Sequence, residues 1–447
     1  MATVATVRYQ RGRGSELMLL GISALITVTA RGLVDYHADV LVISSMVWFT
    51  IAVVAVMLAI NLALRRWARD ADPVIIPAVA ALTGVGLAMI RRIDFAWAAR
   101  GEPTHFGQTQ TMWALIGAGL CVAVIFALRD YRVLRRFTYT AGVLGLVALI
   151  LPLMPVIGRE INGARIWIGL FGRSLQPAEF AKIAFVIFFA GYLQTNRDTL
   201  ALAGPKILGI RFPRARDMGP LIVVWLTAVA VQIFERDLGT SLLLFGIFVG
   251  MLYVATRRTS WVVLGVGLFL IGAAFAGTVF SHVRVRYVAW LHALDPSVYE
   301  SGQSQQLVRG LFGMASGGLF GTGLGEGRPD LVPYAYSDFI IASLGEELGL
   351  TGLLALLMLY VIIVHRAMRT AIGVRDGFGK LLAAGLGFSI ALQTFIVVGG
   401  VMRVIPLTGL ATPFLAAGGS AMIANWIIVA LLLRISDQSR RAQAVLA

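Results

Sequence analysis

The longest polar interruption of the chain is residues 281–338, SHVRVRYVAWLHALDPSVYESGQSQQLVRGLFGMASGGLFGTGLGEGRPDLVPYAYSD. Apolar runs long enough to be membrane helices flank it, and every other gap between such runs is shorter. An idle connection between helices needs only a few residues, so a loop of this length indicates a function. We therefore expect the loop to carry the chemistry and the helices to hold a substrate beneath it.

The composition is that of a membrane protein. Of 447 residues, 58% are hydrophobic and 14% are charged, with a mean hydropathy of +0.83. A soluble domain is about 45–50% apolar and about 25% charged. Repeated apolar runs of roughly 20 residues predict an all-α fold, a polytopic transmembrane helical bundle of about twelve spans. The expected spans are residues 16–35, 40–64, 74–91, 109–128, 137–157, 178–194, 219–234, 239–255, 260–280, 339–364, 381–401 and 410–433.

The basic residues predict an orientation. Most of the 38 Lys and Arg residues fall in segments that share one side of the membrane when the N-terminus is inside. Cytoplasmic loops accumulate Lys and Arg, so both termini are predicted to be cytoplasmic. The 281–338 loop and the shorter 158–177 loop then face outside together. The basic residues 1–14 precede no convincing cleavage site, so the first apolar run is expected to be a retained helix.

The net charge of +15 does not indicate a nucleic-acid partner. Basic residues of membrane proteins face anionic headgroups, so membrane lipid is the expected partner. The single cysteine, Cys121, lies in an apolar run, which excludes an internal disulfide and a thiolate metal site. The residues alone show no ligand cluster that would predict a metal.

Two charged residues lie inside a predicted membrane helix, Glu179 and Lys182. Three residues apart, they share a helix face. An unpaired charge in such a helix costs ~2.5–3.5 kcal/mol on insertion scales, so both should face protein or water. They form either a mutually neutralising structural pair or a polar cavity for an anionic headgroup. Arg165 and Trp167 lie just before this helix, in the 158–177 loop on the outer side.

The 281–338 loop carries several carboxylates that could act as a general base, including Asp295, Glu300 and Asp338. Asp295 is favoured because Pro296 stiffens its backbone and aromatic residues flank it. Partial desolvation would raise its pKa toward that of a useful base. The GTGLGEG run resembles a phosphate loop, but it follows no strand and opens no helix, so a nucleotide site is not predicted.

The helix after the loop carries adjacent carboxylates, Glu346 and Glu347. Both cannot face lipid, so one is expected to pair with a basic residue, with Lys182 or Arg403 as candidates. In another short connection, QIFERDLGTS at 232–241, Asp237 is expected to cap the next helix at a solvated turn.

Near the C-terminus, prolines and glycines interrupt the apolar run that contains Pro406, Gly409 and Pro413. Freed backbone groups are tolerated at membrane depth only where they line a cavity or are buried in protein. Alternatively, the small residues at 418–420 simply let helices pack closely. The sequence does not decide between the two.

Several motifs follow one another along about residues 74–436. They are INGARIWI and SLQPAEFAK within 161–182, ERDLGTSLL at 235–243, WLHALDP at 290–296, GGLFGTGLG at 317–325, SDFIIASLGEELGLTG at 337–352, and IPLTGLATPF with GGS within 405–420. Together they resemble the SEDS family of peptidoglycan glycosyltransferases, the RodA, FtsW and SpoVE group. LGEELGLTG and RVIPLTGL are more similar to the RodA branch.

The resemblance implies polymerisation of lipid II, an undecaprenyl-linked disaccharide peptide, into glycan strands at the outer face of the cytoplasmic membrane during cell-wall elongation. It implies that Asp295 is the catalytic base and that Glu179 and Lys182 form the polar cavity pair. Arg165 would contact the pyrophosphate, with Trp167 beside it. Asp338 and Glu346 match further polar positions of the substrate site.

The resemblance also implies a partner, a class B penicillin-binding protein that acts as the transpeptidase. A divalent cation, Mg²⁺ or Mn²⁺, at the pyrophosphate is compatible with this chemistry, and no other cofactor is implied. The predicted organisation is an N-terminal segment 1–73 with two helices beyond the usual ten-helix pattern, a core 74–436, and a cytoplasmic tail 437–447.

The sequence departs from the family in two places. The family shows DP followed closely by G-x-GYQ-x-x-QS, whereas this loop reads DPSVYESGQSQQLVRG, with Arg309 at the second glutamine. The usual SYGGS is Ala416, Ala417 and then GGS. These differences leave open the alternative of a non-catalytic scaffold for the transpeptidase. A lipid II flippase is a further alternative. A flippase usually shows internal repeats around a midplane site, and this sequence shows no repeat.

Overall fold

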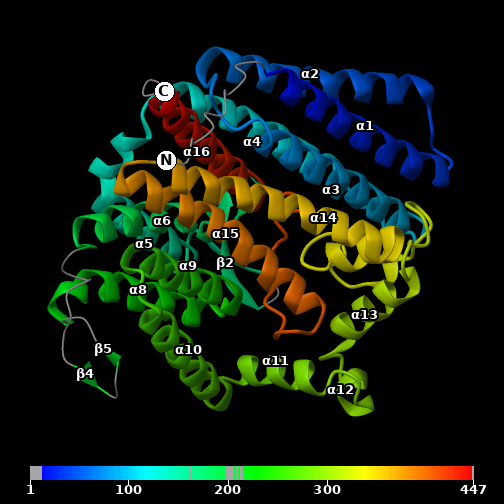
Figure 1. Cartoon of the computed structure of the whole chain (residues 1–447). Coiled ribbons are helices and arrows are strands. Elements are labelled where there is room, and N and C mark those ends of the chain that lie inside the picture. The colour runs from blue at the N-terminus through cyan, green and yellow to red at the C-terminus, as the bar shows by residue number, and fades with distance from the viewer. Residues whose placement is uncertain are drawn as a thin grey trace, which may run out of the picture.

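The computed structural model is a bundle of long helices and describes residues 13–161, 163–170, 172–197, 206–207, 210–211 and 215–444 (Figure 1). Within these residues, eleven helical segments are long and apolar enough to cross a membrane. They are α1 (Gly14–His37), α2 (Ile43–Trp67), α3 (Ile75–Ala98), α4 (Phe106–Ala127), α5 (Thr138–Ile150) with the 3₁₀ helices η1 (Tyr131–Phe137) and η2 (Leu151–Leu153), α6 (Ala178–Thr195), α9 (Leu238–Thr256), α10 (Thr259–Val279), α14 (Ile340–Gly373), α15 (Gly377–Val401) and α16 (Gly419–Ala444).

The predicted bundle is confirmed, and these helices match all but one of the expected spans. The remaining span, 219–234, coincides with α8 (Ala215–Glu235), whose apolar stretch Val223–Gln232 is shorter. Helix α16 continues to Ala444, so the described part of the predicted tail is helical. Arg13 at the start of α1 donates to the carbonyl of Ala68, and Arg440 near the end of α16 pairs with Asp72. Both described ends of the chain therefore lie at one end of the bundle.

The 158–177 segment is a small antiparallel sheet rather than an irregular loop. Its strands are β1 (Gly158–Ile161), β2 (Ala164–Leu170) and β3 (Arg173–Leu175), in the order β1-β2-β3. The amide of Gln176 donates to Ser420 Oγ at 2.8 Å, which ties the sheet to the start of α16. A second pair of short strands, β4 (Lys206–Ile207) and β5 (Ile210–Arg211), is also present.

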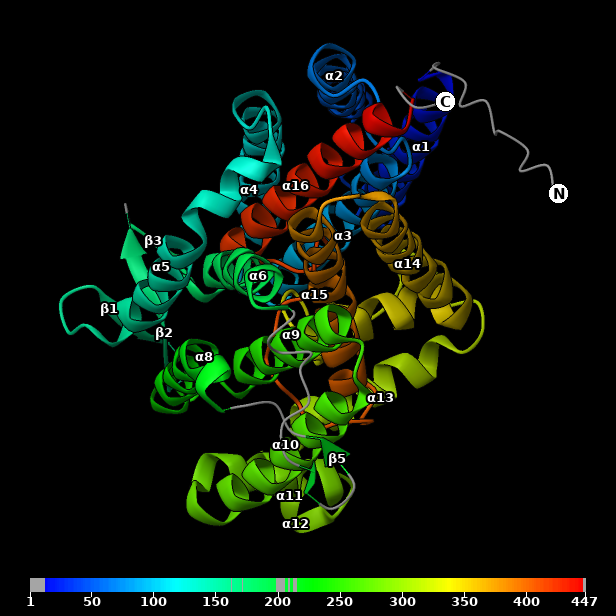
Figure 2. The same ribbon diagram turned by 60° about the vertical axis from the view of Figure 1, so that its left-hand side comes forward.

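The long polar loop contains four short helical elements. They are α11 (Ser281–Leu291), α12 (Pro296–Glu300), α13 (Gln305–Gly317) and the 3₁₀ turn η3 (Pro329–Leu331). Helices α10 to α12 lie far from the start of α1 and the end of α16 in the two ribbon views (Figures 1 and 2). The backbone amide of Ala417 donates to the carbonyl of Tyr336 at 2.8 Å. Because Ala417 is close in sequence to Ser420, the long loop and the β1-β2-β3 sheet meet at one end of the bundle, as predicted.

The helix that follows the loop is broken, whereas the sequence predicted one continuous helix over 339–364. Gly349 inside α14 has φ 68 and ψ −174, which ends a first helical piece after Leu348. A Cβ at Gly349 would lie 2.2 Å from the amide nitrogen of Gly321. The break therefore requires glycine both for its backbone conformation and for this close approach.

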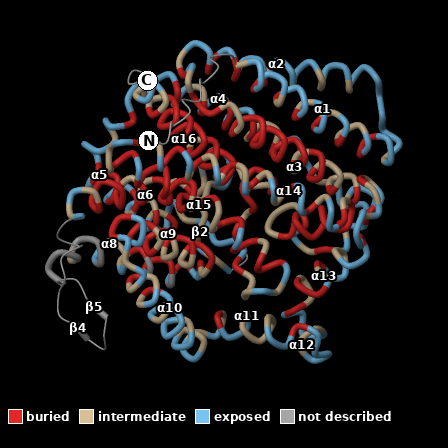
Figure 3. Tube along the Cα trace, viewed as in Figure 1, coloured by how far each residue is buried: buried red, intermediate tan, exposed pale blue. Residues whose placement is uncertain are grey.

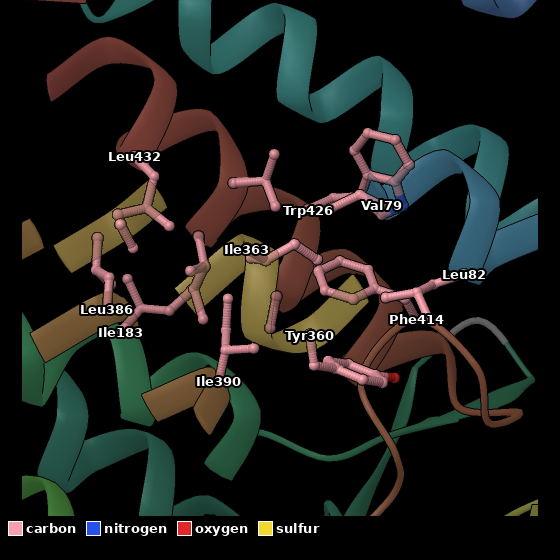
Figure 4. Packing of buried hydrophobic residues seen from close by; sticks show 14 of the residues in the cluster. Val79, Leu82, Ile183, Tyr360, Ile363, Leu386, Ile390, Phe414, Trp426 and Leu432 are labelled. Atoms are coloured by element: carbon pink, nitrogen blue, oxygen red, sulfur yellow. The ribbon is translucent and has the colours of Figure 1, made fainter. Parts of the chain in front are cut away.

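The core lies between α3, α6, α15 and α16, whose membrane-length windows are 83%, 72%, 72% and 89% buried. The same measure is 6% for α10 and 28% for α2, so few residues of these two helices are buried (Figure 3). The centre of the core is drawn in Figure 4, which labels Val79, Leu82, Ile183, Tyr360, Ile363, Leu386, Ile390, Phe414, Trp426 and Leu432.

Residues 402–418 are an irregular segment between α15 and α16, although the sequence predicted that a helix would begin near 410. Their carbonyls accept hydrogen bonds from side chains: Gln110 donates to Ala416 at 3.0 Å and Gln393 donates to Ala411 at 3.0 Å. The segment is thus irregular backbone buried in protein, the first of the two alternatives. Close packing applies at Gly419, where a Cβ would lie 2.5 Å from Trp113.

Candidate functional site

Of the two alternatives left open for Glu179 and Lys182, the structure shows the buried ion pair on α6. Lys182 Nζ lies 2.8 Å from Glu179 Oε2, and the two side chains are 1% and 4% exposed. The lysine also donates to Gln393 Oε1 at 2.7 Å and contacts Asn425 Oδ1 at 3.4 Å. Carboxylate and amide oxygens from three helices thus surround one ammonium group, which is the arrangement that makes burial of a charge tolerable.

Arg286 on α11 connects the long loop to the interior. Its guanidinium donates to the carbonyls of Leu407 at 3.0 Å and Thr408 at 3.2 Å, both in the irregular segment. Asp237 and Asp338 are the carboxylates that interact with it electrostatically. Burial lowers the pKa of Arg286, and these two carboxylates oppose that effect.

Asp237 extends this set of charges toward α6. Its carboxylate caps α9, accepting from the amide of Thr240 at 2.9 Å and from the Thr240 hydroxyl at 2.6 Å. The predicted cap is therefore confirmed, but the predicted solvated turn is wrong, because Asp237 is only 7% exposed. Asp237 also interacts electrostatically with both Arg286 and Glu179. Charged groups thus continue from the α6 pair to the long loop.

Asp338 stands at the end of the long loop, just before α14. Its Oδ2 accepts from Gln306 Nε2 at 3.3 Å, and the residue is partly buried. Burial raises the pKa of Asp338 to about 6, although the bond from Gln306 and the charge of Arg286 act in the opposite direction. A carboxyl group with such a pKa can exchange a proton near neutral pH.

Asp295 occupies a different environment from the one predicted. It precedes α12 with an extended backbone, φ −66 and ψ 129, and its side chain is 56% exposed. Its Oδ2 lies 3.0 Å from Nδ1 of His292, which is 60% exposed. The indole nitrogen of the nearby Trp290 donates to the carbonyl of Arg403 at 3.1 Å. The predicted desolvation of Asp295 is therefore wrong, and the carboxylate is open to a ligand.

The glycine-rich residues 317–328, here called the glycine loop, rest on the first piece of α14. The amide of Gly325 donates to Glu347 Oε2 at 2.8 Å, and the amide of Arg328 donates to Glu346 Oε1 at 2.9 Å. Arg92 of α3 donates to Glu347 Oε1 at 3.2 Å and to the carbonyl of Gly327 at 2.7 Å. Glu346 and Glu347 therefore position the loop.

The prediction that Lys182 or Arg403 pairs with one of the two adjacent glutamates of α14 was wrong. Arg92 pairs with Glu347. Lys182 is engaged by Glu179. Arg403 donates to the carbonyls of Trp290 and Leu291, each at 2.7 Å. Arg92 and Glu347 are 255 positions apart, so no local spacing in the sequence could reveal the pair.

Arg165 and Trp167 lie on β2, away from the buried charges. Arg165 Nε is 3.0 Å from Glu160 Oε2, and the two side chains are 59% and 49% exposed. Trp167 pairs across the sheet with Arg159 and is partly buried. An exposed ion pair contributes little to stability, so the Arg165 guanidinium is free to change partners.

The structure thus groups Glu179, Lys182 and Asp338 through Arg286 and Asp237, whereas it gives Asp295, Arg165 and Glu346 separate surroundings. Sequence reasoning missed Arg286, Gln306, Gln393, Asn425 and Arg92. No local pattern in the sequence marked them, because each bonds to a residue far along the chain, 32 positions away for Gln306 and 255 for Arg92. Among the residues that the structure describes, no group of three or more His, Cys, Asp or Glu could hold a metal ion.

The chain is similar to proteins of known function along most of its length. The sequence pattern of the family FTSW_RODA_SPOVE, described as a cell cycle protein, matches residues 73–441. The chain is 48% identical over 431 residues to the peptidoglycan glycosyltransferase RodA of Mycobacterium tuberculosis (strain ATCC 25618 / H37Rv), covering 96% of this chain and 91% of the relative.

Two solved structures share the fold. One, described as "Structural coordination of polymerization and crosslinking by a peptidoglycan synthase complex", has a TM-score of 0.64 and 24% identity, and covers 83% of this chain and 98% of that chain. A crystal structure of the rod shape determining protein RodA of Thermus thermophilus has a TM-score of 0.58 and 25% identity, and covers 82% of this chain and 96% of that one.

Proposed function

The chain belongs to the FtsW, RodA and SpoVE family of multi-pass membrane proteins, and from that premise we propose that it is a peptidoglycan glycosyltransferase that polymerises lipid II. The hydroxyl oxygen on C4 of one GlcNAc attacks C1 of the MurNAc of another lipid-linked chain. The C1–oxygen bond to the pyrophosphate breaks, and undecaprenyl pyrophosphate leaves with the bonding electrons. The hydroxyl proton passes to a protein base, and the configuration at C1 inverts.

One observation carries this proposal beyond the family match. Charged groups continue from the outer loop into the bundle, from Asp338 through Arg286 and Asp237 to Glu179 and Lys182. A substrate with an anionic pyrophosphate and a hydrocarbon tail needs such a transition from polar to apolar surroundings. A flippase would need polar groups on both sides of a midplane site instead.

In this proposal Asp295 is the general base, since its exposed carboxylate can reach an acceptor hydroxyl. Arg165 binds the pyrophosphate, with Trp167 beside it. Glu179 and Lys182 form the buried polar end of the site. Asp338 contacts the substrate near Gln306, and Glu346 acts through the glycine loop.

The partner is a class B penicillin-binding protein, and the process served is cell-wall elongation. Relatives named RodA share 46–48% identity with this chain, whereas a probable FtsW of Trichlorobacter lovleyi shares 32%. A structural neighbour comes from a complex that couples polymerisation to crosslinking. The reaction takes place at the outer face of the cytoplasmic membrane, with both termini in the cytoplasm.

A divalent cation, Mg²⁺ or Mn²⁺, would have to be bound mainly by the substrate. Within the described residues no three acidic, His or Cys side chains form a ligand group. Magnesium commonly uses one or two carboxylates together with substrate phosphates, and such a cation would neutralise the leaving pyrophosphate.

The test is polymerisation of purified lipid II by the full chain with its partner transpeptidase in detergent, with products sized on a gel. Asp295→Asn is compared with Glu300→Gln, which removes a neighbouring exposed carboxylate at the end of α12. We expect long glycan from the wild type and from Glu300→Gln, and none from Asp295→Asn. Glycan from Asp295→Asn but not from Glu300→Gln would move the base to Glu300. No glycan from a wild type that still binds its partner would refute the proposed activity.

A further inference from the structure

The N-terminal helices α1 and α2 lie outside the matched family range, which begins at residue 73. They cover one side of the bundle and are drawn in dark blue (Figure 2). Helix α1 packs closely on α3, since a Cβ at Gly84 would lie 1.9 Å from Thr27 Oγ1. Its last residues reach the same end of the bundle as the glycine loop.

Asp35 joins the end of α1 to α3. Its Oδ1 lies 2.6 Å from Nε of Arg91, its Oδ2 lies 3.4 Å from Nε of Arg31, and its side chain is 1% exposed. A buried carboxylate held between two guanidinium groups fixes the position of both helices. Removing its charge would leave Arg91 without its acidic partner.

Arg91 is adjacent to Arg92, and the two side chains form ion pairs with different elements. Arg91 binds Asp35 of α1, whereas Arg92 binds Glu347 and the carbonyl of Gly327. Around Arg91 and Arg92, α3 therefore contacts α1 on one side and the glycine loop on the other.

His37 makes a second, direct contact. Its Nδ1 lies 3.4 Å from Glu326 Oε1. Gly325 has φ +105, and a Cβ there would lie 2.9 Å from the Cβ of His37. The end of α1 is thus in contact with the glycine loop itself as well as with the helix that holds it.

We propose that α1 is a positioning element that holds the glycine loop against the first piece of α14 through Asp35 and His37. The consequence for catalysis rests on the proposed glycosyltransferase activity, but the mechanical claim does not. Asp35 and His37 are positioning residues, because neither touches the substrate site described above. Loss of either contact should make the loop open more often, while Glu346, Glu347 and Arg92 still bind it and the bundle stays folded.

Hydrogen–deuterium exchange on the full chain in lipid nanodiscs tests this claim without an activity assay. Asp35→Asn should speed exchange of peptides covering 318–327 by about tenfold, because local opening governs exchange of loop amides. His37→Ala should speed it less, since it removes only the direct contact. Lipid II polymerisation by the same samples should fall in the same order.

The matched control is Glu16→Gln. Glu16 is the other buried carboxylate of α1, it pairs with Arg13, and it lies at the opposite end of the helix. It should leave exchange in 318–327 at the wild-type rate even if the protein melts earlier. Equal acceleration by Glu16→Gln would overturn the proposal, because any loosening of α1 would then suffice. Wild-type exchange in His37→Ala would overturn it even if Asp35→Asn could not be purified. If Asp35→Asn speeds exchange of the loop but the wild-type protein polymerises no lipid II, only the glycosyltransferase proposal is refuted.

Discussion

Two ion pairs in this molecule have the same spacing and opposite surroundings. Glu179 and Lys182 are three residues apart, and so are His292 and Asp295. The first pair is 4% and 1% exposed and the second 56–60% exposed. The buried pair also contacts Gln393 and Asn425 from two further helices, whereas the exposed pair is largely surrounded by solvent. The bundle therefore holds the Glu179–Lys182 pair in one arrangement, whereas the long loop carries a carboxylate, Asp295, that can exchange its partner.

The largest expected effect comes from breaking the buried pair. Lys182→Met leaves the Glu179 carboxylate without its charge partner and should lower the free energy of unfolding by ~3–5 kcal/mol. Adding Glu179→Gln to Lys182→Met should recover much of this loss, because the remaining groups are neutral. Thermal unfolding of the three proteins in one detergent measures the difference. A double variant as unstable as the single would contradict the prediction.

A smaller effect on stability is expected at Arg286, which connects the long loop to the irregular segment 402–418. Arg286→Met removes the donors to Leu407 and Thr408 and should cost ~1–3 kcal/mol, because buried carbonyls lose their bonds. Arg284→Met, on an exposed position of the same helix, is the matched control. Denaturant unfolding of both variants should separate them. Equal stability would mean that the connection through Arg286 is dispensable.

Asp338 gives the comparison a pH dependence. Its folded pKa of about 6 exceeds the unfolded value of about 3.9, so the native state binds the proton more tightly. Protonation of Asp338 therefore stabilises the folded state. This stabilisation is fully present below the unfolded pKa and is lost as pH rises through the folded pKa. Compared with Asp338→Asn, the wild type should therefore be more stable at about pH 4.5 than at about pH 7. Parallel pH profiles of melting temperature for the two proteins would disprove the shift.

The smallest effect is expected from the exposed pair. His292→Ala should change the free energy of unfolding by less than ~0.5 kcal/mol, because solvent screens both charges. Glu160→Gln on the β1-β2-β3 sheet removes another exposed pair and should behave alike. Melting curves of both variants should overlay that of the wild type. A large loss for His292→Ala alone would show that the Asp295 pair is structural.

Local patterns predicted much of this molecule. Apolar run length predicted the spans, and three-residue spacing predicted that Glu179 and Lys182 share a helix face. What failed was non-local. The partner of Glu347 lies 255 positions away, and the break at Gly349 depends on contact with Gly321. Burial also could not be read from neighbours in sequence, so the environments of Asp295 and Asp237 were predicted the wrong way round.

The contact between Gly321 and Gly349 restricts how this sequence can drift. A Cβ at Gly321 would lie 2.2 Å from the carbonyl oxygen of Glu347, and one at Gly349 would lie 2.2 Å from the amide of Gly321. Each obstacle is backbone, which no substitution can shrink. At Gly310 the obstacle is the ring of Phe339, 2.6 Å away, and a smaller residue there could compensate. A substitution of Gly310 can therefore be compensated by a smaller residue at position 339, whereas no substitution elsewhere can compensate for the loss of Gly321 or Gly349.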